Sequence, residues 1–168
     1  MIAPRSESLF SGIGGLDLAV ERVFGARTWV QVEQQPYQRA VLARHWPDAE
    51  QHPDVCAYRG QGAEVVCGGF PCQNVSALGD RAGLEGAKSG LWREFARIIG
   101  ESEPDLVIIE NVAELRIRGL AEVVGDLATL GYASSWATVK ANVGLPRQQP
   151  TPLERASLAI RAAGIGCA

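Results

Sequence analysis

A short apolar run passes into a loop containing glycine and proline in Val65-Val66-Cys67-Gly68-Gly69-Phe70-Pro71-Cys72-Gln73. The apolar residues predict a buried strand, and the paired glycines with Pro71 predict that it ends in a loop. In open α/β folds, loops at the carboxyl ends of parallel strands carry the ligands and the reactive groups. Cys72 is presented there, and an ionised thiol is a strong nucleophile. A single cysteine after a strand is more often a small buried residue, so other stretches must support a catalytic role.

The composition is that of an ordinary globular protein. The 168 residues are 46% hydrophobic and 21% charged, with a net charge of -3 that argues mildly against a nucleic-acid partner. No apolar run approaches the roughly 18 residues of a membrane helix, and the first residues lack the apolar segment of a signal peptide. The four cysteines fit neither a disulfide framework nor a zinc site, so we expect no metal and a reducing, cytoplasmic location.

A glycine-rich turn lies near the N-terminus. Residues 7–10 predict a first strand, followed by Ser11-Gly12-Ile13-Gly14-Gly15. Apolar residues at helical spacing then predict a helix over 16–24, with Leu16, Ala19, Val20, Val23 and Phe24 facing inward. A strand, a glycine turn and a helix are typical of nucleotide binding, because the backbone can approach a ligand at the helix N-terminus. The dinucleotide fingerprint GxGxxG is not met, which disfavours a dehydrogenase.

Two acidic residues follow later strand candidates. Residues 28–33 predict a second strand that ends at Glu33. The number of residues between Gly12 and Glu33 is about that at which an acid binds a ribose hydroxyl in such folds. Pro36 suits the first turn of a helix over 36–44. Asp54 follows Pro53 near another strand end, where a carboxylate either bonds an adenine amino group or caps a turn. Glu33 is also consistent with a solvated strand end.

The middle of the chain continues the alternation of strands and helices. After a polar loop over 74–89, a helix is predicted with Leu91, Phe95, Ile98 and Ile99 on its apolar face. Residues 106–109 are apolar throughout, as in central parallel strands, and run into Glu110-Asn111-Val112. A carboxylate at the end of a buried strand is costly unless it is paired or used, although Glu110 capping a neighbouring backbone remains an alternative.

The last elements complete the predicted architecture. A helix over 119–130 and a strand over 132–141 follow, and residues 153–163 are alanine-rich, which favours a short helix. We therefore expect an α/β fold with a mostly parallel sheet and helices on both faces, incomplete at its C-terminus.

Three stretches, each directly after a predicted strand, occur in the order Leu9-Phe10-Ser11-Gly12-Ile13-Gly14-Gly15, Gly69-Phe70-Pro71-Cys72-Gln73 and Glu110-Asn111-Val112. In this combination the chain resembles the DNA cytosine carbon-5 methyltransferase family over about residues 7–147. Ser89-Gly90-Leu91-Trp92, Glu33 and Asp54-Val55 match further motifs of the family in position. The resemblance implies a Rossmann-like methyltransferase fold that binds S-adenosylmethionine and acts on double-stranded DNA.

The resemblance also implies roles for individual residues. Cys72 would be the nucleophile and Glu110 the acid, supported by Pro71, Gln73 and Asn111. Glu33 would bind the ribose and Asp54 the adenine, while the family's frequent stacking Trp is replaced by Gln34. The whole set implied to bind the cofactor is Phe10, Ser11, Gly12, Ile13, Gly14, Gly15, Leu16, Glu33, Asp54, Val55 and Leu91.

The chemistry of cytosine needs these residue types. Carbon 5 is a weak nucleophile until a thiolate adds at carbon 6, and Cys72 is the candidate thiolate. Charge then develops at ring nitrogen 3, where Glu110, with its pKa raised by the expected burial, would donate a hydrogen bond. A base within a duplex is out of reach of such a site, so the base must be flipped out.

The C-terminal part departs from the family pattern. Val143-Gly144-Leu145-Pro146 is present, but Gln149 and Thr151 stand where two arginines are expected, and we predict no later strand. We expect a catalytic domain over residues 1–147 and a divergent tail over 148–168, without a target-recognition region and with impaired activity. The alternatives are an inactive remnant, one subunit of a split enzyme completed by a second chain, and an RNA cytosine methyltransferase.

Overall fold

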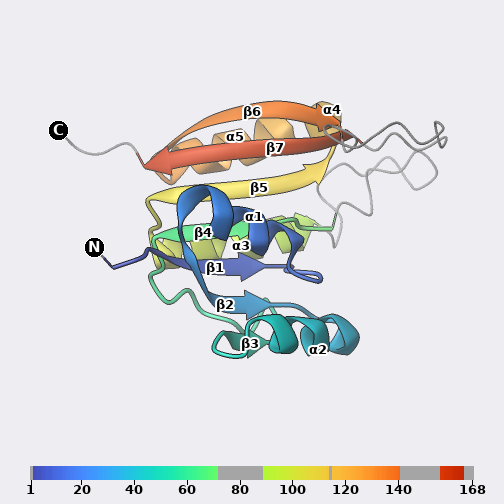
Figure 1. Cartoon of the computed structure of the whole chain (residues 1–168). Coiled ribbons are helices and arrows are strands. Elements are labelled where there is room, and N and C mark those ends of the chain that lie inside the picture. Colours follow the sequence, from blue (N-terminus) through green and yellow to red (C-terminus); the bar gives the residue numbers. More distant parts are fainter. Residues whose placement is uncertain (1, 72–88, 114, 141–155, 165–168) are drawn as a thin grey trace.

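The computed structural model describes residues 2–71, 89–113, 115–140 and 156–164. These residues form a seven-stranded sheet in the order β3-β2-β1-β4-β5-β7-β6 (Figure 1). β1 to β5 are parallel, and β7 is antiparallel to both β5 and β6, so the prediction of a mostly parallel sheet is confirmed. The strands are β1 (Arg5–Leu9), β2 (Arg27–Val32), β3 (Glu50–His52), β4 (Val65–Gly68), β5 (Leu106–Val112), β6 (Tyr132–Lys140) and β7 (Ala156–Gly164).

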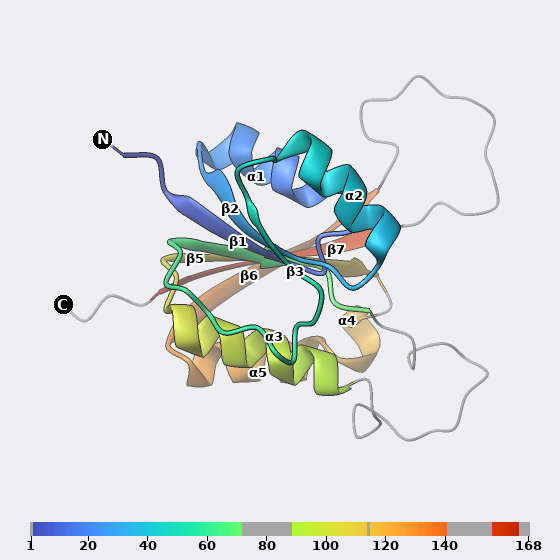
Figure 2. The ribbon, with the colours of Figure 1, turned by 90° about the horizontal axis from the view of Figure 1, so that it is seen from below.

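Helices cover both faces of the sheet, as the alternating pattern predicts. α1 (Gly15–Phe24) and α2 (Pro36–His45) lie on one face, and α3 (Ser89–Ser102) and α5 (Leu120–Thr129) lie on the other (Figure 2). A single helical turn, α4 (Leu115–Arg118), precedes α5 and was not predicted. The architecture is the Rossmann-like α/β fold expected from the sequence.

The main core lies between the sheet and α3. Phe95, Ile98 and Ile99 are fully buried as predicted, whereas the predicted Leu91 is only partly buried and its neighbour Trp92 is fully buried. The rings of Phe70 and Trp92 lie 5.3 Å apart between centroids, so the residue before Pro71 is anchored in the core. The loop that leads to Cys72 therefore starts from a rigid base.

The predicted apolar stripe of α1 is wrong in its second half. Val20 is buried, but Val23 and Phe24 are 72% and 40% exposed. The helix is turned so that Asp17 instead faces the sheet and is fully buried. The contact of this helix with the sheet is therefore partly polar, through hydrogen bonds from Ser8 and Gln31 to the Asp17 carboxylate.

The C-terminal segment corrects two predictions. The alanine-rich residues form β7 rather than a helix, and a strand does follow residue 147. β7 is hydrogen-bonded to β5 on one side and β6 on the other, and these two ladders outweigh the helix propensity of alanine. Ile160 and Ala162 are buried while Arg161 between them is exposed, which is the alternation of a strand.

The strand order places a crevice beside β1. The chain moves outward from β1 to β2 and β3, and then returns to β4 on the other side of β1. Open parallel sheets bind ligands outside the carboxyl ends of the strands at such a reversal.

Candidate functional site

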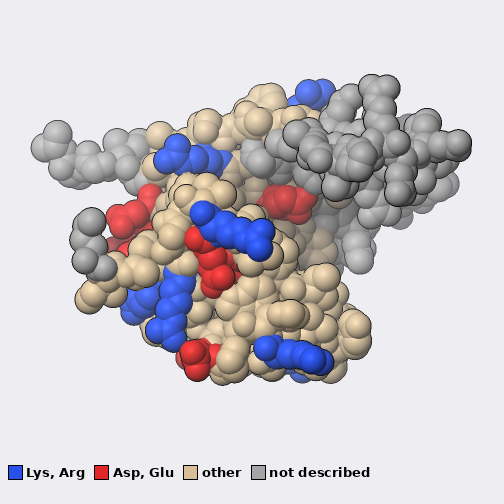
Figure 3. Space-filling model, viewed as in Figure 1, with Lys and Arg blue, Asp and Glu red and all other residues tan. Residues whose placement is uncertain are grey.

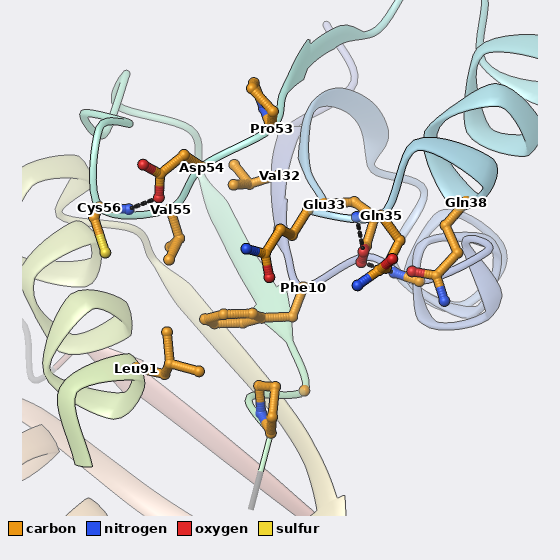
Figure 4. Close-up of a pocket in the computed structure, with 14 residues that line it drawn as sticks. Phe10, Val32, Glu33, Gln35, Gln38, Pro53, Asp54, Val55, Cys56 and Leu91 are labelled. Carbon is orange, nitrogen blue, oxygen red and sulfur yellow. Dashed lines mark hydrogen bonds between the residues drawn. The ribbon is translucent and has the colours of Figure 1, made fainter. Parts of the chain in front are cut away.

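A cavity of about 590 Å³ opens at the carboxyl ends of β1, β2, β3 and β4 (Figure 4). Each of these strands contributes the residues that follow it, and α3 contributes Leu91. A volume of this size suits a ligand of nucleoside dimensions. The lining residues are Phe10, Gly12, Val32, Glu33, Gln34, Gln35, Gln38, Pro53, Asp54, Val55, Cys56, Gly69, Pro71 and Leu91.

Glu33 joins the glycine turn to the end of β2. Its Oε2 accepts a hydrogen bond from the backbone N–H of Gly12 at 2.9 Å, and its Oε1 accepts one from Gln35 N at 2.8 Å. The side chain is only 8% exposed, so the backbone hydrogen bonds stabilise a nearly buried carboxylate. Gly12 and Glu33 thus lie at one site and both line the cavity, whereas the contact of Glu33 with a ribose stays a prediction.

Asp54 occupies a turn directly after β3. Its Oδ1 accepts a hydrogen bond from Cys56 N at 2.9 Å, and its backbone oxygen accepts one from Tyr58 N at 3.1 Å. The residue is exposed and lines the cavity, whereas its neighbour Val55 is buried. The predicted alternative of a turn cap is confirmed, and because Asp54 also lines the cavity, a bond to an adenine amino group stays a prediction.

Apolar side chains form the middle of the cavity. Figure 4 shows the Phe10 ring projecting between Leu91 and the end of β2, with Val55 beyond it. Phe10 has a positive φ of 56°, unusual for a side chain without a hydrogen-bonding group, and its ring stacks on Phe95 at 6.3 Å. The packing of the ring against the core supports this backbone conformation and fixes an aromatic surface inside the cavity.

Five of the residues implied to bind the cofactor do not line the cavity. Ser11, Ile13, Gly14, Gly15 and Leu16 lie in or directly after the turn. Ser11 donates to the Ser8 oxygen at 2.9 Å, and Ile13 is 62% exposed. Gly14 precedes α1 with a φ of 88°, and no side chain caps the helix, so its N-terminus stays open. These residues shape the turn, and Phe10 and Gly12 face the cavity.

The described part of the Cys72 loop is tied to the end of β5. Asn111 Nδ2 donates a buried hydrogen bond to the backbone oxygen of Phe70 at 3.0 Å. Pro71 follows and lines the cavity. Cys72 and Gln73 lie outside the described residues, as do the predicted loop that follows them and the segment with Gln149 and Thr151.

Glu110 lies beside the start of this loop but is not buried. A Cβ placed on Gly69 would lie 2.9 Å from the Glu110 backbone oxygen and 3.4 Å from its Oε2, so the carboxylate is next to the loop that leads to Cys72. The prediction of a buried carboxylate is wrong, because Glu110 is exposed. Leu106 and Ile108, on the same face of β5 as Glu110, pack against the small apolar cluster that contains Val20 of α1. Glu110 lies beyond this cluster, at the carboxyl end of β5.

Sequence reasoning missed several site residues. The cavity is also lined by Gln35, Gln38 and Cys56. In the sequence, only their closeness to predicted strand ends indicated that they could contribute to a site. Asp17 was also missed: it accepts hydrogen bonds from Ser8 Oγ at 2.9 Å and Gln31 Nε2 at 2.7 Å beneath the glycine turn. Burial raises the pKa of Asp17, and the two hydrogen bonds oppose that effect.

The structure supports a nucleoside-type ligand in this cavity. Glu33 and Asp54 offer carboxylate oxygens suited to hydroxyl and amino groups, and Phe10, Val32, Val55 and Leu91 offer apolar walls suited to a flat base. The donor set contains no cluster suited to a metal: among the described residues, no group of three His, Cys, Asp or Glu side chains is close enough to hold one.

Comparison with known proteins defines the class. The model of the C-5 cytosine-specific DNA methylase family matches residues 5–149, and the chain belongs to this family. Members of the family are DNA cytosine-5 methyltransferases that use S-adenosylmethionine.

Individual relatives agree with this assignment. The chain is 33% identical over 161 residues to the type II methyltransferase M2.BsuMI of Bacillus subtilis, covering 90% of the chain and 41% of that protein. It is 28% identical over 144 residues to the type II methyltransferase M.CviJI of Paramecium bursaria Chlorella virus IL3A, covering 83% and 39%. The chain thus spans about two fifths of the length of these relatives.

Solved structures share the fold. The Dnmt2 methyltransferase of S. pombe matches 98% of this chain and 52% of its own, with a TM-score of 0.77 at 18% identity. A DNA modification methyltransferase encoded within an E. coli prophage matches 96% and 47%, with a TM-score of 0.75 at 21% identity.

Within the described residues, no helix is both long and apolar enough to cross a membrane.

Proposed function

We propose that this chain is the cofactor-binding and catalytic part of an intracellular DNA cytosine-5 methyltransferase, which transfers a methyl group from S-adenosylmethionine to carbon 5 of cytosine. The hydrogen bond from Asn111 to Phe70 carries the proposal, because it connects two motifs that are 41 residues apart at the mouth of one cavity. Family membership over residues 5–149 supports the same reaction class.

The cavity would hold the cofactor through residues that the structure places around it. Glu33 would accept hydrogen bonds from the ribose hydroxyls, and Asp54 would accept one from the adenine amino group. Phe10, Val55 and Leu91 would pack against the flat and apolar parts of the ligand. When bound, S-adenosylmethionine supplies a methyl group made electrophilic by its sulfonium.

The protein's own residues would prepare the cytosine. The Cys72 thiolate would add to carbon 6, which gives carbon 5 the electron density it needs. Glu110 would serve as the acid at ring nitrogen 3 as charge develops there, and its position beside Gly69 supports this role. Once carbon 5 carries the methyl group, loss of its proton to solvent would expel the Cys72 thiolate from carbon 6 and restore the aromatic ring.

Double-stranded DNA is the proposed substrate, but the described residues offer little general attraction to it. On the face shown in Figure 3, acidic and basic side chains are interspersed, consistent with the net charge of -3. Binding of phosphates ordinarily depends on a basic surface. We therefore expect slow reaction of the 168-residue chain with DNA.

Trapping on DNA that carries 5-fluorocytosine tests the mechanism, because fluorine at carbon 5 cannot leave as a proton does. With excess protein, S-adenosylmethionine and long incubation, we expect a covalent adduct that is lost in Cys72→Ala. Cys56→Ser is the matched control, because Cys56 is an exposed thiol that lines the cavity. An adduct that survives Cys72→Ala would refute the assigned nucleophile, and cofactor binding without any adduct would limit this chain to the cofactor-binding role.

A further inference from the structure

One arginine on α3 connects that helix to the turn after β3. Arg97 Nη2 donates hydrogen bonds to the backbone oxygens of Val55 at 3.0 Å and Tyr58 at 2.9 Å. These two oxygens belong to the turn that carries Asp54, more than 35 residues away in sequence. The guanidinium therefore fastens one wall of the cavity to the helix that supplies Leu91 on another side.

Two carboxylates hold the guanidinium in this orientation. Nε donates to Glu94 Oε2 at 2.8 Å, and Nη1 donates to both carboxylate oxygens of Glu101, at 2.7 and 2.8 Å. Because every nitrogen of the planar group has a partner, Arg97 cannot rotate away from the turn without breaking several charge-assisted hydrogen bonds. The side chain is 26% exposed, so solvent screens these contacts only partly.

We infer that Arg97 is a positioning residue for the nucleoside half of the cofactor, acting through the turn that carries Asp54. This inference rests on the proposed function. Without the guanidinium, the turn keeps its local bonds to Asp54, from Cys56 N and Tyr58 N, and those from Arg59 Nη1 to the oxygens of Cys56 and Tyr58. Those bonds fix the shape of the turn, and its remaining hydrogen bond to α3, from Gly60 N to Glu101 Oε2 at 2.8 Å, lies beyond the residues that line the cavity.

Lysine is the informative replacement, because it keeps the positive charge beside Glu94 and Glu101. A single ammonium group has three donors and no planar fork, so it cannot serve both carboxylates and both backbone oxygens together. Arg97→Lys should thus preserve the helix and loosen the turn. Arg93→Lys is the matched control, since Arg93 is an exposed arginine on the same helix.

The experiment is a double-mutant cycle read by calorimetric titration with S-adenosylmethionine and, separately, with adenosine. We expect Arg97→Lys to weaken both ligands about tenfold, the size of one lost hydrogen bond to a charged group. Asp54→Ala should weaken them similarly, and the double variant should be no weaker than the weaker single variant, because Arg97 acts through Asp54. Arg93→Lys should bind as the unaltered chain does.

Hydrogen exchange adds a readout that does not depend on the ligand. In Arg97→Lys the amides of Cys56 and Tyr58 should exchange faster while those of α3 stay protected. Glu94→Gln, which removes a bracing charge but keeps the guanidinium, should give a smaller change in the same direction and serves if Arg97→Lys does not fold. Unchanged affinity with unchanged exchange, or additive losses with Asp54→Ala, would overturn the inference. If the unaltered chain binds neither ligand, the proposed cofactor assignment fails with it.

Discussion

Asn111 and Phe70 are joined by a buried hydrogen bond in which the side-chain amide of Asn111 donates to the backbone oxygen of Phe70 at 3.0 Å. The backbone N–H of Val112 donates in turn to Asn111 Oδ1 at 2.8 Å, which fixes the orientation of the amide. The end of β5 thereby sets the position of the backbone two residues before Cys72. Asn111 does not line the cavity itself, so a change there should act on it through the loop, whose Gly69 and Pro71 do.

We predict that Asn111→Ala destabilises the protein by about 1–3 kcal/mol, the cost of leaving a buried oxygen without its donor. Urea unfolding followed by tryptophan fluorescence measures the free energy of unfolding. Thr129→Ala is the control, because the Thr129 hydroxyl makes an exposed hydrogen bond to Gly125 O and should change stability by about 0.5 kcal/mol or less. Equal effects of the two substitutions would contradict the structural role of Asn111.

The glycine turn gives a second, paired prediction. Gly14 has a φ of 88°, and a Cβ there would overlap the ring of Trp46, whereas a Cβ on Gly15 meets nothing within 4 Å. We expect Gly14→Ala to cost about 2–4 kcal/mol, from backbone strain and overpacking together. Gly15→Ala should be close to neutral. Thermal unfolding of both variants compares them directly, and similar stability would show that Trp46 does not pack on Gly14.

Asp17 gives a prediction about pH. Because burial raises its pKa in the folded protein, its ionisation disfavours folding, and stability is lost as pH rises from its ordinary value of 3.8 through the raised folded value. An asparagine at this position is able to keep both hydrogen bonds without the charge, because its amide oxygen accepts from Gln31 and its amide nitrogen donates to the Ser8 hydroxyl. We therefore expect Asp17→Asn to gain stability relative to the unaltered chain as pH rises across that window and to hold the gain at neutral pH. Urea unfolding from pH 3 to 8 measures this, and a difference that shrinks with rising pH would contradict it.

The described cysteines should differ in reactivity. Cys56 is exposed at the cavity, and Cys67 is fully buried, with burial raising the pKa of its thiol far above the usual range. Partial desolvation and the Asp54 carboxylate also raise the pKa of Cys56, so its labelling should speed up with pH. We expect iodoacetamide to modify Cys56 in the folded protein and Cys67 only after unfolding, as mass spectrometry of peptides would show. S-adenosylmethionine should slow the labelling of Cys56, and Cys67→Ala should leave that protection unchanged.

Much of the fold could be predicted because local patterns and topology agree. The apolar residues of β5 read as a buried parallel strand, and the alternation of strands and helices required helices on both faces. β7 could not be predicted in the same way, because its alanine-rich sequence favours a helix locally. Only the pairing with β5 and β6, distant in sequence, makes it a strand.

The candidate site divides along similar lines. Glu33 and Asp54 could be placed because acids after parallel strands gather at one edge of the sheet. Arg97 could not, since a charged residue on an amphipathic helix normally reads as solvated, and its partners Val55 and Tyr58 contribute backbone oxygens that leave no trace in the sequence. Asp17 was missed for a related reason: an acid in the first turn of a helix is ordinary, and its burial depends on Ser8 and Gln31 in two strands.

The position of β7 between β5 and β6 has a consequence for how the chain is synthesised. β6 emerges from the ribosome before β7, yet among the described strands its hydrogen-bonded neighbour is β7 alone. Until residues 156–164 have been translated, β5 is the border of a five-stranded parallel sheet, and β6 has no strand to pair with. The nascent protein can thus form the wall of the cavity around β1 to β4 first, and β7 enters between β5 and β6 later.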